Sequence, residues 1–393
     1  MATAPSGANP DAYGNNVPYL RTISGPWSFF RRMRILAGGQ VLEDIDYYNR
    51  AHELFHMFRT TDNGMNDSIQ ATGQYTNHII NNGLHPYIAE STCFNYGGIY
   101  PGDSMTVLFK PLSGILNQTK YIPIRYCPIQ IELEIVNDIL DPIIWPNELN
   151  EDSVGDTPTG FFTQRNCSGN WQIHDVQAKC DLCTLDNSLE NEYAKHLLEG
   201  KSLPIQYDTY VQQFQTVASS DFVTNISRSF TRLKSVFVSM TGVMNYPETT
   251  KSWNMFYNPA WGSNQVVKGF FSSKYQMEFQ MQVGSRLYPE YPIRSQQEAF
   301  YQTTKTLGLA SSAWHSIDIT PPEWNSCKFV YGLDTEKVTE AGFTGLNTKA
   351  GDLIYLKLQQ YQVPAEALCN GMYVILHADQ ILNIRDTGCE VFD

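Results

Sequence analysis

The fold is decided by the stretch Tyr121-Ile-Pro-Ile-Arg-Tyr-Cys-Pro-Ile-Gln-Ile-Glu-Leu-Glu-Ile-Val136. From residue 129 to residue 135, isoleucine and leucine alternate with glutamine and glutamate. A period of two places the apolar side chains on one face of a β-strand and the polar side chains on the other. Pro123 and Pro128 lack a backbone N–H, so we expect the first half of the stretch at a sheet edge or a bulge.

Strand patterns also occur on both sides of this stretch. Gly38-Gly39 is typical of a turn, and it separates the apolar segments 33–36 and 41–45. The other predicted strands are residues 105–109, 171–185, 235–240, 275–283, 353–358 and 372–377. Short strands separated by loops rich in Gly, Pro and Asn favour a β-sandwich or a jelly roll.

Helical patterns are few, and they are predicted at residues 46–58, 187–200 and 295–307. In the second of these, Asn187 or Ser188 can cap the start, and Gly200 ends the helix. In the third, Ser295 and Glu298 have the spacing of a capping box. The second helix lies at the midpoint of the chain with strand-rich segments on both sides, so we place a domain boundary near residue 201.

Composition narrows the class of protein. The chain has 393 residues, with 40 acidic against 27 basic side chains, a net charge of −13, 17% charged residues and 13% aromatic residues. Few charges with many aromatics argue against disorder and favour a β-rich chain with buried or partner-covered surfaces. The negative charge argues against a protein whose main role is to grip nucleic acid. No apolar run approaches the ~18 residues of a membrane span, and the N-terminus does not resemble a signal peptide.

Cysteine usage points to structural thiols. Eight cysteines are too few for a disulfide scaffold in a chain of this length. Cys180 and Cys183 form a single C-x-x-C in a strand-like stretch, whereas a structural zinc site needs a second pair. Metal or redox use of this pair is the alternative.

Two long polar stretches, 64–102 and 139–170, are longer than ordinary connections between strands and are expected to form functional surface.

One motif carries a catalytic alternative. His52-Glu-Leu-Phe-His56 matches H-E-x-x-H, in which two histidines one helical turn apart bind zinc and Glu53 acts as a base. A third ligand such as Glu90 or His78 would have to come from a loop, and no G-x-x-H follows. Apolar residues at 54, 55 and 58 favour a packing helix with surface histidines instead.

Charged and aromatic clusters have simpler interpretations. The basic residues Arg31, Arg32 and Arg34, and in a second cluster Arg228, Arg232 and Lys234, could touch nucleic acid, but in an acidic chain salt bridges are expected. Glu132 and Glu134 lie on one face of one strand, which favours a solvated or subunit-facing surface over a catalytic pair. The aromatic segment 253–257 with Trp261 fits a ligand platform or an interface.

Several segments together resemble a known family. Residues 109–126, followed by the alternating strand 129–136, look like the "PL…G…N…YLPLR" segment of double jelly-roll major capsid proteins. Residues 182–192, 203–207 and 212–215 are similar to the passage between the two domains of that family, and residues 227–237 to the strand that follows. Residues 41–45 and 372–382 also fit. The resemblance is to the Polinton-like and virophage-related branch of the nucleocytoplasmic large DNA virus capsid lineage.

The resemblance implies an all-β fold of two tandem eight-stranded jelly rolls with a few short helices in loops. It implies an N-terminal arm at residues 1–20, a first jelly roll at 21–200 and a second at 201–393. Three chains would form a pseudo-hexagonal capsomer, and capsomers would tile an icosahedral virion shell around double-stranded DNA. The implied partners are neighbouring capsomers, a single jelly-roll penton protein and minor capsid proteins, with no tight nucleic-acid binding and no membrane span.

The same resemblance implies a structural protein rather than an enzyme, with no catalytic residues, metal or cofactor. Two rival functions remain open. One is a jelly-roll carbohydrate-binding or receptor-binding module, and the other is a zinc metallopeptidase that uses His52, Glu53 and His56.

Overall fold

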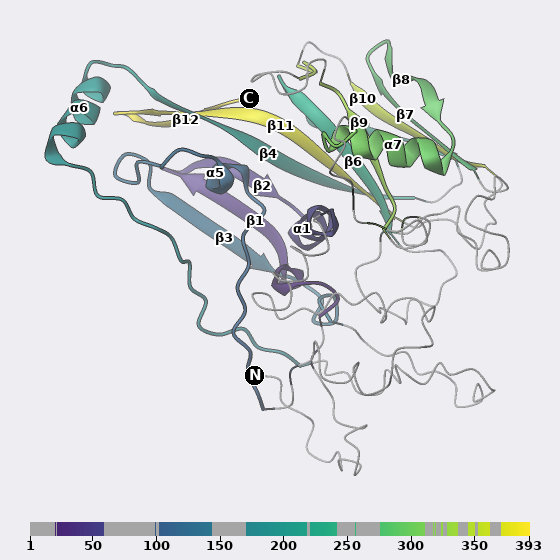
Figure 1. Ribbon diagram of the computed structural model, residues 1–393, viewed down its shortest axis with the longest axis horizontal. Coiled ribbons are helices and arrows are strands. Elements are labelled where there is room, and N and C mark those ends of the chain that lie inside the picture. Colours follow the sequence, from purple (N-terminus) through teal and green to yellow (C-terminus); the bar gives the residue numbers. More distant parts are fainter. Residues whose placement is uncertain are drawn as a thin grey trace.

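The structure is a computed structural model, and it describes part of the chain. The described residues are 20, 22–58, 99, 102–143, 170–217, 221–241, 256, 276–310, 317, 319, 324, 328–336, 345–349, 353–361 and 371–393. Nearly all of the predicted N-terminal arm and most of the two long polar stretches lie outside these residues. Three antiparallel sheets form the framework, and Figure 1 shows how they are arranged.

The first half of the chain contributes a three-stranded sheet with the order β2-β1-β3. Its strands are β1 (Phe30–Ala37), β2 (Gln40–Ile45) and β3 (Ile129–Ile135). Gly38 and Gly39 have φ values of +55° and +87°, which suit glycine at the predicted turn between β1 and β2. From residue 33 onward the side chains of β1 alternate, since Met33 and Ile35 are fully buried while the intervening Arg34 is partly exposed.

Strand β3 is confirmed, but its expected burial is only half right. Ile131 and Ile135 remain 41% and 49% exposed, although the pattern predicted a buried apolar face. Within the described residues β3 pairs with β1 on one side and lies at the edge of its sheet, so one side of the strand is uncovered there. Period two fixes which side chains share a face, but not whether that face is covered.

The second half of the chain forms two larger sheets. Strand β11 pairs with β4 along one side and with β12 and β6 along the other, and β9 continues beyond β6. The second sheet has the order β5-β10-β7-β8. Their strands are β4 (Leu203–Thr216), β5 (Asp221–Ile226), β6 (Leu233–Thr241), β7 (Gln276–Val283), β8 (Arg286–Ile293), β9 (Val330–Asp334), β10 (Ile354–Tyr361), β11 (Gly371–Arg385) and β12 (Gly388–Phe392). The predicted strands at 235–240, 275–283, 353–358 and 372–377 are confirmed.

Two predicted strands are wrong. Residues 105–109 and 171–185 run without strand pairing, and many of their side chains are exposed. A segment with an apolar or alternating pattern forms a strand only when a neighbouring strand pairs with its backbone N–H and C=O groups. The pattern of these two segments therefore shows which of their side chains are apolar, but it does not show whether a partner strand lies beside them.

The three predicted helices are present as α1 (Tyr48–Met57), α6 (Asn187–Leu198) and α7 (Gln296–Thr306). The capping box of α7 is confirmed, since the Glu298 N–H donates to Ser295 Oγ at 3.1 Å. The cap of α6 differs from the prediction, because the Asp186 carboxylate accepts from the Ser188 N–H. The described residues also include two shorter helical turns, η1 (Pro26–Phe29) and α5 (Gly114–Asn117). No helix in the described ranges is long and apolar enough to span a membrane.

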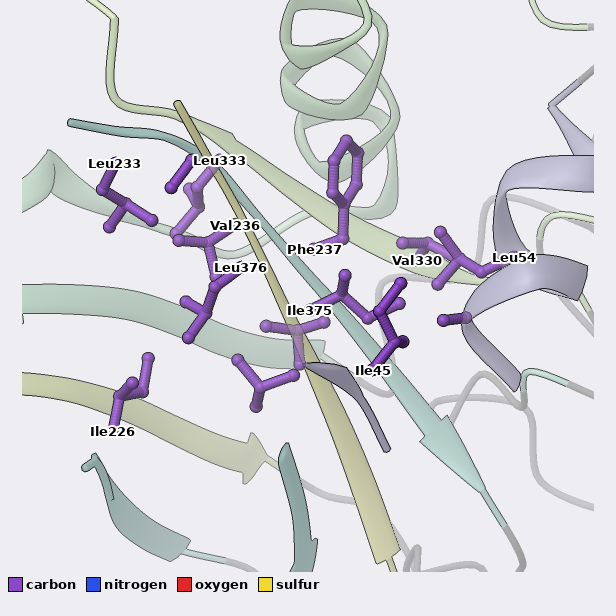
Figure 2. Close-up of a cluster of buried hydrophobic side chains, with 14 of the residues drawn as sticks. Ile45, Leu54, Ile226, Leu233, Val236, Phe237, Val330, Leu333, Ile375 and Leu376 are labelled. Carbon is purple, nitrogen blue, oxygen red and sulfur yellow. The ribbon is translucent and has the colours of Figure 1, made fainter. Parts of the chain in front are cut away.

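One large hydrophobic core joins the two halves of the chain. Ile45 from β2 and Leu54 from α1 lie in the same cluster as Phe237 from β6, Val330 from β9 and Ile375 from β11, as Figure 2 shows. In Figure 1 the first sheet lies alongside the long β4 and β11 strands, while α6 projects at one end. The two halves therefore stabilise each other by shared apolar burial.

Candidate functional site

The H-E-x-x-H helix packs against one tryptophan. The Trp27 indole stacks on the His52 ring at a centroid distance of 4.0 Å and contacts the His56 ring at 4.7 Å. Both histidines are buried, with 4% and 6% exposure, so the expectation of surface histidines is wrong. The reason is tertiary, because Trp27 from η1 and Phe109 from a distant segment cover this face of α1.

The polar atoms of the motif are committed to packing partners. His52 Nε2 lies 3.0 Å from the Lys110 carbonyl oxygen, which can only accept, so this nitrogen carries a proton. The Glu53 carboxylate accepts from Trp27 Nε1 at 3.0 Å. Burial raises the pKa of Glu53 to about 7, although the Trp27 hydrogen bond opposes the shift. All three motif residues thus converge on one indole ring.

This arrangement does not resemble a zinc site. The His52 and His56 ring centroids are 6.5 Å apart, and within the described ranges no group of three His, Cys, Asp or Glu side chains could hold a metal ion. The proposed third ligands, Glu90 and His78, lie outside the described residues. A zinc ion would need two imidazole nitrogens each about 2.0–2.1 Å away, whereas here the Trp27 indole packs against both histidine rings.

A buried carboxylate that sequence reasoning missed connects β2 to α5. Glu43 is 1% exposed, and its carboxylate accepts from Ser113 Oγ, from the Gly114 N–H at 2.7 Å and from the Ile115 N–H at 3.3 Å. Burial raises the pKa of Glu43 to about 7 despite these three donors. The Tyr207 hydroxyl donates to the neighbouring Leu42 carbonyl at 3.0 Å. Glu43 therefore fixes α5 in the contact region between the first sheet and β4.

A second buried network lies within the large sheet. Lys234 Nζ is 3.0 Å from the Asp208 carboxylate and 3.4 Å from that of Asp379, which is 3% exposed. Burial raises the pKa of Asp379 to about 6, and its hydrogen bond with Asp208 adds to the shift. Burial opposes ionisation of Asp208, but hydrogen bonds from His377 and Asp379 hold its pKa well below the usual range. One lysine thus balances two carboxylates that share a site.

The first basic cluster forms the predicted salt bridges. Arg32 donates to both oxygens of Asp44 at 2.6 and 2.7 Å, and Arg34 pairs with Glu132. Glu134 lies opposite Arg32 in the β1–β3 register. Glu132 and Glu134 therefore face arginines of β1, which is a partner that the predicted solvated or subunit-facing surface did not include. In the second cluster, Lys234 pairs with acids as described above.

Exposed apolar side chains gather on the passage between the two halves. Val176, Leu182 and Leu198 are 71%, 75% and 76% exposed. The thiols of Cys180 and Cys183 are free and exposed on the same extended segment, which is not the strand that was expected. From the aromatic segment 253–257, Phe256 is described, and it is buried in the core rather than part of a ligand platform. The rest of that segment and Trp261 lie outside the described residues.

Comparison with known proteins gives a fold. No protein-family model matches the chain, and no curated protein matches it either. Among solved structures, the quasi-atomic model of the PBCV-1 virus capsid matches with a TM-score of 0.53 at 11% identity, covering 96% of this chain and 88% of that chain. The Sputnik virophage structure matches with a TM-score of 0.53 at 10% identity, covering 100% and 79%. PBCV-1 VP54 fitted into a Sputnik reconstruction gives 0.52 at 13% identity, covering 96% and 91%.

These likenesses extend over nearly the whole chain, so they apply to both halves and not to a single sheet. They confirm the predicted fold class, an all-β jelly-roll fold of the double jelly-roll capsid type with few short helices. The number of eight strands in each roll stays a prediction, because the first half has three strands among the described residues. At these identities the comparison shows the fold, and function requires separate support.

Proposed function

We propose that this chain is a structural protein of a virion, a major capsid protein of a DNA virus. The observation that carries the proposal is the fold likeness to the PBCV-1 and Sputnik capsids over 96–100% of the chain. In this proposal residues 21–200 and 201–393 are the two jelly rolls, and residues 1–20 are an N-terminal arm. The chain is not an enzyme, which fits the packing role of the H-E-x-x-H helix.

The proposed assembly is a homotrimer in which six rolls give a pseudo-hexagonal capsomer. Capsomers tile an icosahedral shell around double-stranded DNA, with a single jelly-roll protein at the vertices and minor capsid proteins between capsomers. Closed symmetric assembly needs large surfaces with few charges. The low charged fraction of 17% and the exposed Leu182 and Leu198 support such surfaces.

Light scattering coupled to size-exclusion chromatography tests the trimer, and negative-stain imaging tests the sheets. Three chains of 44.6 kDa give a particle of about 134 kDa. We expect this mass over a wide concentration range, together with hexagonal arrays at high protein concentration. A stable monomer that forms no arrays under any condition would contradict the proposal.

Surface variants locate the contacts between copies. Leu182→Ser and Leu198→Ser remove exposed apolar side chains, so they should weaken trimers or arrays and leave the melting temperature of the isolated chain unchanged. Lys195→Ser is the matched control, because Lys195 is exposed on the same helix but is not apolar. If the control weakens assembly as much as the leucine variants do, apolar contact at this passage is not the cause.

Two other functions give different results in the same assays. A carbohydrate-binding or receptor-binding module would remain a small free oligomer and would bind a glycan array or a cell surface. A zinc metallopeptidase would contain stoichiometric zinc by metal analysis and would cleave peptides. Cleavage that is lost in both His52→Ala and Glu53→Gln would overturn the structural proposal.

A further inference from the structure

Two buried thiols that are far apart in the sequence lie close together beside the first sheet. Cys127 precedes β3, and Cys389 lies on β12, close to the C-terminus. Their side chains are 0% and 6% exposed, and the Cys389 thiol is close enough to Cys127 to affect the pKa of its thiol. The Cys389 thiol also contacts the Tyr126 carbonyl oxygen at 3.8 Å. The contact therefore links the first half of the chain to its last strand.

Ordered backbone holds both cysteines in place. Next to Cys127, the Pro128 carbonyl accepts from the Gly38 N–H at 3.3 Å, which ties the start of β3 to the β1–β2 turn. Cys389 pairs with Ile384 in the β11–β12 hairpin, so the position of its sulfur follows from the register of that hairpin. Because the Cys389 sulfur lies beside the residue that precedes Cys127, the two buried thiols are neighbours and can be joined once their side chains adjust to disulfide geometry.

We propose that Cys127 and Cys389 form a disulfide when the protein meets an oxidant such as glutathione disulfide. The thiolate of one cysteine attacks glutathione disulfide, forms a mixed disulfide and releases one glutathione thiolate. The second cysteine loses its proton to solvent and attacks the protein sulfur of that mixed disulfide, which releases the second glutathione. Two electrons pass from the two cysteines to glutathione disulfide. This inference is independent of the proposed function.

The surroundings of the pair make the reaction slow but specific. Burial, together with the contact to Cys389, raises the pKa of the Cys127 thiol well above its usual range, so little thiolate exists at neutral pH. The oxidant reaches the pair only when the C-terminal hairpin opens locally. Cys180 and Cys183 are exposed and should react first. The two cysteine pairs can therefore be distinguished by the time at which each is oxidised.

The test uses the purified full-length chain in a glutathione redox buffer, quenched with an alkylating reagent at increasing times. We expect non-reducing peptide mapping to show a linked Cys127–Cys389 pair that forms more slowly than Cys180 and Cys183 are modified. Glutathione at high concentration should reverse the link. If Cys127 and Cys389 are still alkylated separately, or are joined to other cysteines, after the exposed thiols have fully oxidised, the proposal is wrong.

Variants add a second readout. Oxidation should raise the melting temperature by roughly 5 °C, because the link closes a very long loop. Cys389→Ser should abolish this rise, and the double variant Cys180→Ser/Cys183→Ser should keep it. A rise that survives in Cys389→Ser, or disappears in the double variant, contradicts the assignment. If Cys389→Ser does not fold, the peptide map of the wild-type chain decides the question alone.

Discussion

Replacing Gly114 by alanine should break the contact between the two halves of the chain. A Cβ atom at Gly114 would lie 1.5 Å from the Asp208 carbonyl oxygen and 2.5 Å from its carbon, whereas ordinary contacts begin at 3.4 Å. The obstacle is the backbone of β4, which β11 pairs along its whole length. Because β4 cannot yield, α5 has to move away by about 2 Å.

The expected loss of stability follows from the hydrogen bonds that α5 makes at this position. Its first N–H groups, from Gly114 and Ile115, donate to the buried Glu43 carboxylate at 2.7 and 3.3 Å. A movement of this size breaks or stretches both hydrogen bonds, and bonds to a charged group contribute about 1.5–3 kcal/mol each. Adding the overpacking cost, we expect Gly114→Ala to lower the free energy of unfolding by about 4 kcal/mol.

Urea denaturation followed by tryptophan fluorescence measures this loss. Gly39→Ala is a suitable control, because a Cβ atom there meets nothing within 4 Å while φ is +87°. That variant has backbone strain alone, which costs about 1 kcal/mol. If Gly114→Ala is no less stable than Gly39→Ala, α5 does not pack on β4 as described, and the account of Glu43 is also refuted.

Four further predictions concern the buried networks and the net charge. The pKa of Glu43 is about 7 in the folded chain against 4.5 ordinarily, so the stability that protonated Glu43 contributes is complete below pH 4.5 and is lost as the pH rises through 7. The free energy of unfolding of the wild-type chain should therefore fall by about 3 kcal/mol more than that of Glu43→Gln between pH 4.5 and 8, as measured by urea denaturation. Lys234→Met leaves Asp208 and Asp379 without their shared cation and should cost about 3 kcal/mol at pH 7. That loss should shrink at pH 4.5, where Asp379, with a pKa of about 6, holds its proton; an equal loss at both pH values would argue against the network. Trp27→Leu removes the stack on the histidines of α1 and should cost about 3 kcal/mol in thermal unfolding, with circular dichroism checking that the sheets remain. In fluorescence anisotropy with duplex DNA at physiological salt, the wild-type chain should show a dissociation constant no tighter than about 10⁻⁶ M.

The strands of the fold could be predicted where local pattern and final environment agree. Residues 235–240 and 372–377 are mostly apolar, and they became β6 and β11, which are buried strands of one sheet. The segment 171–185 also has a strand-like pattern, a partial alternation of apolar and polar residues, but it runs unpaired among the described residues. The difference lies in the presence of a partner strand, which is a long-range property that a local period does not encode.

The buried polar site could not be predicted for a related reason. Glu43 follows Leu42 in β2 and by alternation shares the face of the buried Ile45, but a carboxylate is ordinarily expected to stay exposed to solvent. It is buried because α5 brings two N–H groups to that face from about seventy positions further along the chain. Likewise, the histidines of α1 are covered by Trp27, which no helical period identifies.

The same long-range pairing gives the net charge a structural meaning. On β1, Arg32 and Arg34 project outward between β2 and β3, and each meets an acid on a neighbouring strand. A row of arginines that is already ion-paired offers few free donors to phosphate groups, because each contact would first have to break a salt bridge. The excess of acidic side chains adds a long-range electrostatic repulsion between this chain and polyanions such as DNA. In the proposed capsomer, association between copies would then rest on apolar contacts such as those that Leu182 and Leu198 offer, since surfaces of equal charge repel each other.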